Sequence, residues 1–286
     1  MTICEALEKG REILENNNID EAKLNAELFL SDILNCKRLD LYSEINNVLS
    51  QENLEKYFFY IERRIKNEPL QYILGKAWFY GYEFYVNEYV LVPRPETEIL
   101  VEKILEDIYS SNFKSLKIFE IGSGSGCISI AIAKELEKRK IIYNISSIEV
   151  SSKAIEIADK NKELNNIKGE LSFIHSDLFV IENLDEKFDY IISNPPYISI
   201  DEFEKLDKEV KNFEPGISLT DFGDGLKFYK KIFELISYYK FNSKIFLEIA
   251  YNRKEQIQEL LKEFKLKKYN FYKDYSSNFR ILKIET

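Results

Sequence analysis

The chain has 286 residues, of which 45% are hydrophobic and 31% are charged, and its formal net charge is −9. This length allows one large domain or two smaller domains with separate cores. The composition is that of a globular protein: no apolar run approaches the roughly 20 residues of a membrane span, and the acidic charge argues against non-specific binding of nucleic acid.

The first residues, MTICEALEKGREILE, form an amphipathic pattern without the apolar core of a signal peptide. We therefore expect a cytoplasmic protein with no membrane partner and no direct nucleic-acid partner. The three cysteines are widely spaced, and His175 is the only histidine. The sequence thus predicts neither a disulfide framework nor a metal site, and it argues against a hydrolase that depends on histidine.

Residues 1–74 are predicted to form a helical domain. Apolar residues recur there at spacings of three and four, in the segments 4–14, 22–33 and 54–65. Asn18 and Asp20 offer a cap between the first two helices.

Residues 75–95 are predicted to form a β-hairpin linker, because aromatic residues follow at strand-like spacing between glycines. Trp78, Phe79 and Tyr80 are expected in the core between the two domains rather than on a substrate-binding platform. Pro93 and Pro95 end the extended segment, and a helix with acidic residues in its first turn should follow.

Strands and helices alternate through residues 96–286. Strands are predicted at 117–121, 145–150, 171–175, 190–193 and 245–249, helices at 127–136, 153–164, 201–211, 225–239 and 255–264, and a closing antiparallel pair at 269–275 and 279–284. This alternation favours an α/β fold whose parallel sheet is covered on both faces. Ligands bind at the carboxyl ends of such strands, so we expect the chemistry in the loops after Ile121, Ile148, Ser176 and Ser193.

A glycine-rich loop joins the first strand of this region to its first helix. Its sequence is Glu120-Ile121-Gly122-Ser123-Gly124-Ser125-Gly126. Alternate glycines let the backbone approach a ligand closely. The loop has no lysine at the helix start, and its glycines do not follow the dinucleotide pattern, so it is typical of neither a P-loop nor a dinucleotide site.

Acidic residues follow the next two strands. Glu149 ends the second strand, where its two oxygens can accept hydrogen bonds from the adjacent hydroxyls of a ribose. Asp177 follows the third strand and can accept from the amino group of an adenine, with Leu178 as an apolar wall. A solvated loop acid at Glu149 and a simple turn residue at Asp177 are the alternatives.

Asn194-Pro195-Pro196-Tyr197 follows the apolar strand 190–193. Proline cannot donate to a sheet ladder, so it ends the strand and leaves nearby carbonyls free to accept hydrogen bonds. The Asn194 side-chain oxygen and the Pro195 carbonyl can accept hydrogen bonds from both N–H groups of a planar substrate nitrogen. Tyr197 can cover the flat face of that substrate group. The alternative is an ordinary strand-ending turn.

The order of these motifs resembles S-adenosylmethionine-dependent methyltransferases that act on planar nitrogen. The longer motifs Glu68-Pro-Leu-Gln-Tyr-Ile-Leu-Gly75 and Leu91-Val-Pro-Arg-Pro-Glu-Thr-Glu98 are similar to those of the peptide-chain release factor glutamine methyltransferases. The likeness extends over most of the chain, including Glu214-Pro215, Asp224-Gly225-Leu226 and Leu247-Glu248-Ile249.

The resemblance implies a Rossmann-like methyltransferase domain at 96–286, with a mostly parallel seven-stranded sheet and an antiparallel last strand, and a substrate-binding helical domain before it. It implies transfer of a methyl group from S-adenosylmethionine, leaving S-adenosylhomocysteine, to the glutamine amide of the Gly-Gly-Gln motif of bacterial release factors. The cofactor would be bound by Glu120, Gly122, Ser123, Gly124, Ser125, Gly126, Glu149, Asp177, Leu178 and Asn194, and the glutamine by Asn194, Pro195, Pro196 and Tyr197. We expect a monomer.

Three points stay open in the sequence. A glutamine methyltransferase of a ribosomal protein and an adenine or guanine N-methyltransferase of nucleic acid would both suit the Asn-Pro-Pro-Tyr motif. A non-catalytic adenosine-binding or scaffold protein is a further alternative, and the intact motif argues against it. Arg94 and Glu96 either shape the substrate cleft or form a salt-bridged linker. Leu178 stands where the family can carry an aromatic residue, which weakens the predicted stacking on adenine.

Overall fold

The computed structural model describes residues 1–111, 113–181, 187–239 and 242–286. The chain divides into two compact units: Met1–Gly75 with Asp207–Phe213, and Lys76–Leu206 with Glu214–Thr286. Within the described ranges, no helix is both long enough and apolar enough to cross a bilayer.

The first unit is helical, as its spacing of apolar residues predicts. It contains α1 (Ile3–Asn16), α2 (Ala22–Ile33), α3 (Asp40–Ser43), α4 (Gln51–Arg64), α5 (Leu70–Leu74) and, from far along the chain, α10 (Lys208–Phe213). Phe29, Leu30 and Tyr57 are fully buried in its core. The predicted cap at Asn18 or Asp20 is wrong: the N-cap of α2 is Glu21, which adopts a left-handed conformation and makes no side-chain capping bond.

The second unit begins with the predicted hairpin, formed by β1 (Lys76–Phe79) and β2 (Tyr82–Tyr85) in antiparallel pairing. Phe79 is 1% exposed and packs with Phe84 in the core. Trp78 is 66% exposed and does not share this core. The two neighbours point to opposite faces because side chains alternate along a strand.

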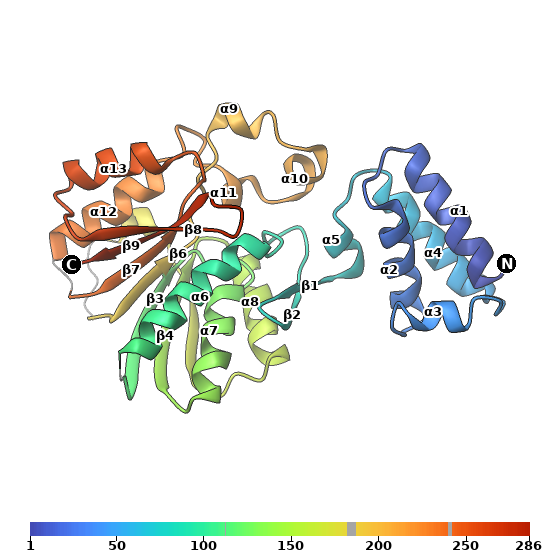
Figure 1. Ribbon diagram of the computed structural model, residues 1–286, viewed down its shortest axis with the longest axis horizontal. Helices are drawn as coiled ribbons and strands as arrows, with labels where there is room; N and C mark the ends of the chain where they lie inside the picture. Colours follow the sequence, from blue (N-terminus) through green and yellow to red (C-terminus); the bar gives the residue numbers. More distant parts are fainter. Residues whose placement is uncertain (112, 182–186, 240–241) are drawn as a thin grey trace. The chain divides into compact units, whose positions relative to one another are not determined.

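Among the described residues, seven strands form the main sheet, in the order β5-β4-β3-β6-β7-β9-β8 (Figure 1). Their bounds are β3 (Ser115–Ile121), β4 (Ile142–Glu149), β5 (Glu170–His175), β6 (Tyr190–Ser193), β7 (Lys244–Glu248), β8 (Tyr269–Lys273) and β9 (Phe279–Glu285). The strands β3 to β7 pair in parallel, and β9 is antiparallel to both β7 and β8. The predicted mostly parallel sheet with an antiparallel last strand is confirmed.

Helices cover both faces of this sheet (Figure 1). One face packs on α6 (Pro95–Ser110), α7 (Cys127–Lys138) and α8 (Ser152–Leu164), and the other on α12 (Lys227–Tyr239) and α13 (Lys254–Glu263). Pro95 is the first residue of α6, with Glu96 and Glu98 in the first turn, as predicted. Short helices α9 (Ile200–Phe203) and α11 (Gly216–Leu219) lie in the long connection after β6.

Candidate active site

A cavity of about 310 Å³ opens at the carboxyl ends of β3, β4, β5 and β6, where the sequence predicts the chemistry. This volume is in the range of small-molecule sites. Ten of the predicted site residues line it: Gly122, Ser123, Gly124, Ser125, Glu149, Asp177, Leu178, Asn194, Pro195 and Pro196. Glu120, Gly126 and Tyr197 are not among its lining residues.

The glycine-rich loop turns over the end of the neighbouring strand. The backbone N–H groups of Gly122 and Ser123 donate to the Ile148 carbonyl at 2.9 and 3.2 Å. Gly124 has a left-handed φ of +52°, and no atom lies within 4 Å of the position that a Cβ would take there. The loop therefore leaves open space beside its backbone, and α7 begins directly after it.

Glu149 is half-buried at the end of β4, and the loop holds its carboxylate. Oε2 accepts from the Gly124 N–H at 3.0 Å, and Oε1 accepts from the Ser151 N–H at 3.0 Å. Each oxygen has a second lone pair. Glu149 is therefore oriented by the backbone and can still accept hydrogen bonds from a ligand in the cavity.

After β5, the chain forms a 3₁₀ turn, Leu178–Val180, which Asp177 caps through its side chain. Asp177 Oδ1 accepts from the Phe179 N–H at 2.9 Å, so the turn role considered for it is present alongside its place in the cavity. Leu178 is 4% exposed and lines the cavity.

Three lining residues that the sequence does not single out form an aromatic and cationic wall. The ring centroids of Phe179 and Phe228 lie 5.2 Å apart in an edge-to-face arrangement, and the Lys227 Nζ lies 4.5 Å from the centroid of the Phe179 ring. Phe179 thus supplies an aromatic surface next to the position where Leu178 lacks one. The signal in the sequence is only its place directly after Leu178.

Asn194 and the prolines end β6 at the cavity. Asn194 Nδ2 donates to Thr97 Oγ1 at 3.1 Å, and both residues line the cavity. No described residue donates a hydrogen bond to the Pro195 carbonyl. The Asn194 oxygen and the Pro195 carbonyl are therefore the acceptors that this motif presents.

Tyr197 lies beside a buried carboxyl group. Its hydroxyl donates to Glu248 Oε1 at 3.2 Å, and its ring packs against the core on the α12 side. Glu248 is 2% exposed, and burial raises its pKa to about 7, against the opposing effects of Thr97, Arg280 and Tyr197. The contact of Tyr197 with a substrate stays a prediction.

Glu120 is fully buried beneath the glycine-rich loop. The hydroxyls of Ser129 and Ser147 donate to its Oε2, and Oε1 has no hydrogen-bond partner among the described residues. Burial raises its pKa to about 7, and these hydroxyls act in the opposite direction. Gly126 is the N-cap of α7.

Arg94 lies at the cavity and also forms an ion pair, and its part in shaping a substrate cleft stays a prediction. It lines the cavity, and its Nη2 pairs with Glu214 Oε1 at 2.5 Å. Glu214 Oε2 also accepts from the Val92 N–H at 3.3 Å, so this buried carboxylate joins the segment before α6 to the connection after β6. Glu96 is exposed and is not a lining residue.

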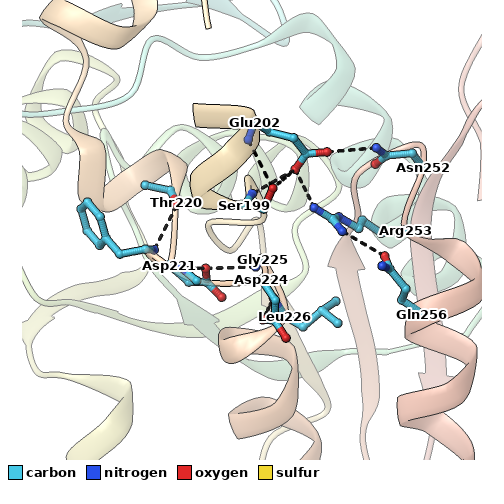
Figure 2. A network of polar contacts seen from close by, with 12 residues as sticks. Ser199, Glu202, Thr220, Asp221, Asp224, Gly225, Leu226, Asn252, Arg253 and Gln256 are labelled. Atoms are coloured by element: carbon cyan, nitrogen blue, oxygen red, sulfur yellow. Dashed lines mark hydrogen bonds and ion pairs between the residues drawn. The ribbon is translucent and has the colours of Figure 1, made fainter. Parts of the chain in front are cut away.

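Figure 2 shows the polar network that fixes the connection after the Asn-Pro-Pro-Tyr motif. Asp221, a lining residue, accepts from the N–H groups of Gly223 and Gly225 at 2.7 and 3.0 Å, and from that of Lys227 at 2.9 Å. A second group of contacts in the same view joins α9 to the segment before α13: the Glu202 carboxylate pairs with Arg253 at 2.5 Å and accepts a hydrogen bond from the Asn252 side chain at 3.1 Å.

The polar and apolar groups that line the cavity fit S-adenosylmethionine. Glu149 offers acceptors for ribose hydroxyls, Leu178 and Phe179 offer apolar surface for adenine, and the loop backbone lies open beside them. Ser123 Oγ is buried at the cavity and has no partner among the described residues, which is typical of a polar atom reserved for a ligand.

Two family models match the chain: the PrmC N-terminal domain over residues 5–75 and the methyltransferase small domain over residues 95–209. Among solved structures, the hMettl16 catalytic domain in complex with the MAT2A 3′UTR hairpin 1 has a TM-score of 0.56 at 14% identity, covering 91% of this chain and 90% of that one. At this identity the likeness supports the methyltransferase fold alone.

Curated relatives are much closer. The release factor glutamine methyltransferase of Fusobacterium nucleatum is 40% identical over 276 residues, covering 96% of this chain and 76% of the relative. The same-named protein of Thermodesulfovibrio yellowstonii is 40% identical over 259 residues, covering 89% and 88%. These matches confirm the resemblance seen in the motifs, and the chain therefore belongs to the release factor glutamine methyltransferases, a family of S-adenosylmethionine-dependent enzymes.

Proposed function

We propose that the enzyme methylates the side-chain amide nitrogen of the glutamine in the Gly-Gly-Gln motif of bacterial peptide-chain release factors. The observation that carries this proposal is the arrangement at the end of β6. There, Asn194 donates to Thr97 through Nδ2, so its oxygen is the group left for a ligand. The glycine-rich loop and Glu149 line the same cavity, so one small space offers both a cofactor site and an amide site.

The chemistry explains why these acceptors matter. An amide nitrogen is a weak nucleophile because its lone pair is delocalised into the carbonyl. S-adenosylmethionine, when bound, supplies a methyl carbon made electrophilic by a positive sulfur. The Asn194 oxygen and the Pro195 carbonyl accept hydrogen bonds from the two N–H groups of the glutamine amide. These hydrogen bonds orient the nitrogen and stabilise the positive charge that develops on it. This scheme needs no dedicated base, because the proton can leave after methyl transfer.

We assign the remaining roles by position. Residues 1–74 bind the release factor, residues 75–95 form the linker between the two domains, and residues 96–286 bind S-adenosylmethionine and catalyse methyl transfer. The family models over 5–75 and 95–209 support this division. α10 belongs to the helical unit by its contacts, so the binding surface would include residues 207–213. The proposal includes action in the cytoplasm, where release factors work, as a monomer.

The decisive assay offers a release factor, a ribosomal protein and nucleic acid side by side, with labelled S-adenosylmethionine. We expect label on the release factor alone, and none on a release factor whose Gly-Gly-Gln glutamine is replaced by alanine. Equal labelling of that altered factor would refute the assignment of the glutamine. Label on the ribosomal protein or nucleic acid instead would establish one of the other two substrates.

Two variants separate the two halves of the site and serve as controls for each other. Asn194→Ala should abolish transfer to the release factor and largely keep the affinity for S-adenosylmethionine. Glu149→Ala should weaken cofactor binding by about 1–3 kcal/mol, since it removes hydrogen bonds to a charged acceptor. Calorimetry measures the affinities. An unchanged affinity of Glu149→Ala for S-adenosylmethionine would refute the proposed role of Glu149 in binding the ribose.

A further inference from the structure

Alternation along two parallel strands brings polar residues of separate motifs to one face of the sheet. Tyr190 and Ile192 of β6, and Phe246 of β7, belong to the core on the α6 side. Side chains repeat every second residue in a strand, so Asn194 and Glu248 continue this face beyond the apolar part. Ser193 pairs with Leu247 in the register, so Asn194 and Glu248 come next to each other at the strand ends.

The first turn of α6 lies against this pair. Thr97, the third residue of α6, is 3% exposed and lines the cavity. Its Oγ1 accepts the hydrogen bond from Asn194 Nδ2 at 3.1 Å. A hydroxyl that accepts here can still donate its own proton. The buried Glu248 carboxyl, which also accepts from the Tyr197 hydroxyl at 3.2 Å, is an acceptor for this proton: hydrogen bonding from the Thr97 side chain lowers the pKa of Glu248, against the larger effect of burial.

This contact decides which end of the Asn194 amide meets a ligand. A primary amide has a donor end and an acceptor end of nearly equal size, so an asparagine without a fixed partner can present either one. The nitrogen of Asn194 is engaged by Thr97, which leaves the oxygen as the end available in the cavity. If the amide turned over, its nitrogen would face the N–H bonds of a glutamine and repel them.

We infer that Thr97 is a positioning residue for methyl transfer: its hydroxyl oxygen holds the Asn194 amide with the oxygen directed to the substrate nitrogen, a role that rests on the proposed function. Thr97 itself need not touch the glutamine. It acts through Asn194, and Glu248 and Tyr197 complete the hydrogen-bonded group from the other side.

Two substitutions isolate the hydroxyl. Thr97→Val keeps the branched shape and removes the acceptor, whereas Thr97→Ser keeps the hydroxyl and removes only a methyl group. We expect Thr97→Val to lower kcat for release factor methylation by roughly 10- to 100-fold, because the lost hydrogen bond frees the Asn194 amide to turn. Thr97→Ser should stay within about threefold of the wild type. Neither should change the dissociation constant of S-adenosylmethionine by more than about twofold.

A measurement without turnover tests the contact itself. The side-chain NH₂ signals of Asn194 are identified in ¹⁵N spectra by their loss in Asn194→Ala. Hydrogen exchange of these protons should be slow in the wild type and in Thr97→Ser, and at least about fivefold faster in Thr97→Val. This readout depends on the hydrogen bond and does not depend on the identity of the substrate.

The outcomes are distinct. Full activity of Thr97→Val beside an active wild type would overturn the inference, since the hydroxyl would then not be needed. An equal loss of activity in Thr97→Ser and Thr97→Val would also overturn it, since packing and not the hydroxyl would then matter. Unchanged exchange in Thr97→Val would overturn it as well. Lack of transfer to the release factor by the wild type would instead refute the proposed function, together with the catalytic consequence of Thr97, while the exchange comparison would still decide the contact.

Discussion

Glu248 shows how a single buried side chain can make stability depend on pH. It stands at the carboxyl end of β7, 2% exposed, and its Oε2 has no hydrogen-bond partner among the described residues. Burial raises its pKa from 4.5 to about 7, although Thr97, Arg280 and Tyr197 oppose the rise. Ionising it in the folded protein therefore costs more than ionising it in the unfolded chain.

The sign of the effect follows from proton binding. Between pH 4.5 and about 7 the folded protein keeps the proton on Glu248 and the unfolded chain does not. The folded state binds more protons, so the free energy of unfolding falls as pH rises through this window, by about 3 kcal/mol from this group. Below pH 4.5 and above pH 7 the group adds no further slope.

Glu248→Gln should remove this part of the pH dependence, because glutamine resembles the protonated acid and never ionises. We expect the free energy of unfolding of the wild type to fall more steeply than that of the variant between pH 5 and 7.5, as measured by urea unfolding. Glu120 has a similarly raised pKa, but it is present in both proteins and cancels. Glu255→Gln, at an exposed position of α13, is the control and should keep the slope of the wild type. Equal slopes in the Glu248→Gln variant and the wild type would count against the burial effect.

At the scale of elements, the segment after the Asn-Pro-Pro-Tyr motif is held by the loop 219–225. Ile198 donates through its N–H to the Leu219 carbonyl at 3.0 Å, and Ile200 to that of Gly223 at 2.9 Å. Gly225 packs directly against this segment: a Cβ there would lie 2.4 Å from the Tyr197 carbonyl oxygen. With φ at +80°, the position also favours glycine by its backbone conformation.

Gly225→Ala should therefore push this loop away from Tyr197 and disturb the end of β6. Gly81→Ala is a matched control, because Gly81 has φ of +78° and no atom within 4 Å of its Cβ position. The control should cost only the left-handed strain of about 1–2 kcal/mol and keep full activity. We expect Gly225→Ala to be less stable than the control and to lose methylation activity, as measured by urea unfolding and labelled methyl transfer. Equal stability and activity in the two variants would show that the loop can move away from Tyr197 at no measurable cost in free energy or activity.

How far the sequence reaches depends on whether a feature is local. The start of α6 follows from Pro95, and the end of β6 follows from Pro195 and Pro196, because proline acts on its own backbone. The contact of Thr97 with Asn194 joins residues 97 positions apart, and nothing in either motif specifies it. Trp78 and Phe79 share one aromatic run, yet strand alternation exposes one and buries the other.

At the scale of the whole molecule, the two compact units are not two continuous stretches of chain. α10 lies late in the sequence, but its contacts place it in the helical unit with residues 1–75. Arg64, 7% exposed, joins the pieces: its Nη2 pairs with Glu209 at 2.8 Å, and its Nε donates to Asn25 Oδ1 at 2.8 Å. Arg64 and Glu209 are 145 positions apart, so the pairing is invisible in the sequence.

Arg64→Leu should destabilise the helical unit by about 2–4 kcal/mol, because the Asn25 Oδ1 atom and the Glu209 carboxylate then lose the guanidinium that they bind. Hydrogen exchange, followed by mass spectrometry of peptides, should then rise in α2, α4 and α10 and stay unchanged in β3, β4 and β6. Arg11→Leu, at an exposed pair with Glu15 at 3.8 Å, is the control and should change exchange little. An equal rise in the sheet would mean that both units open together, whereas a rise in α2 and α4 without α10 would mean that Arg64 does not hold α10 to this unit.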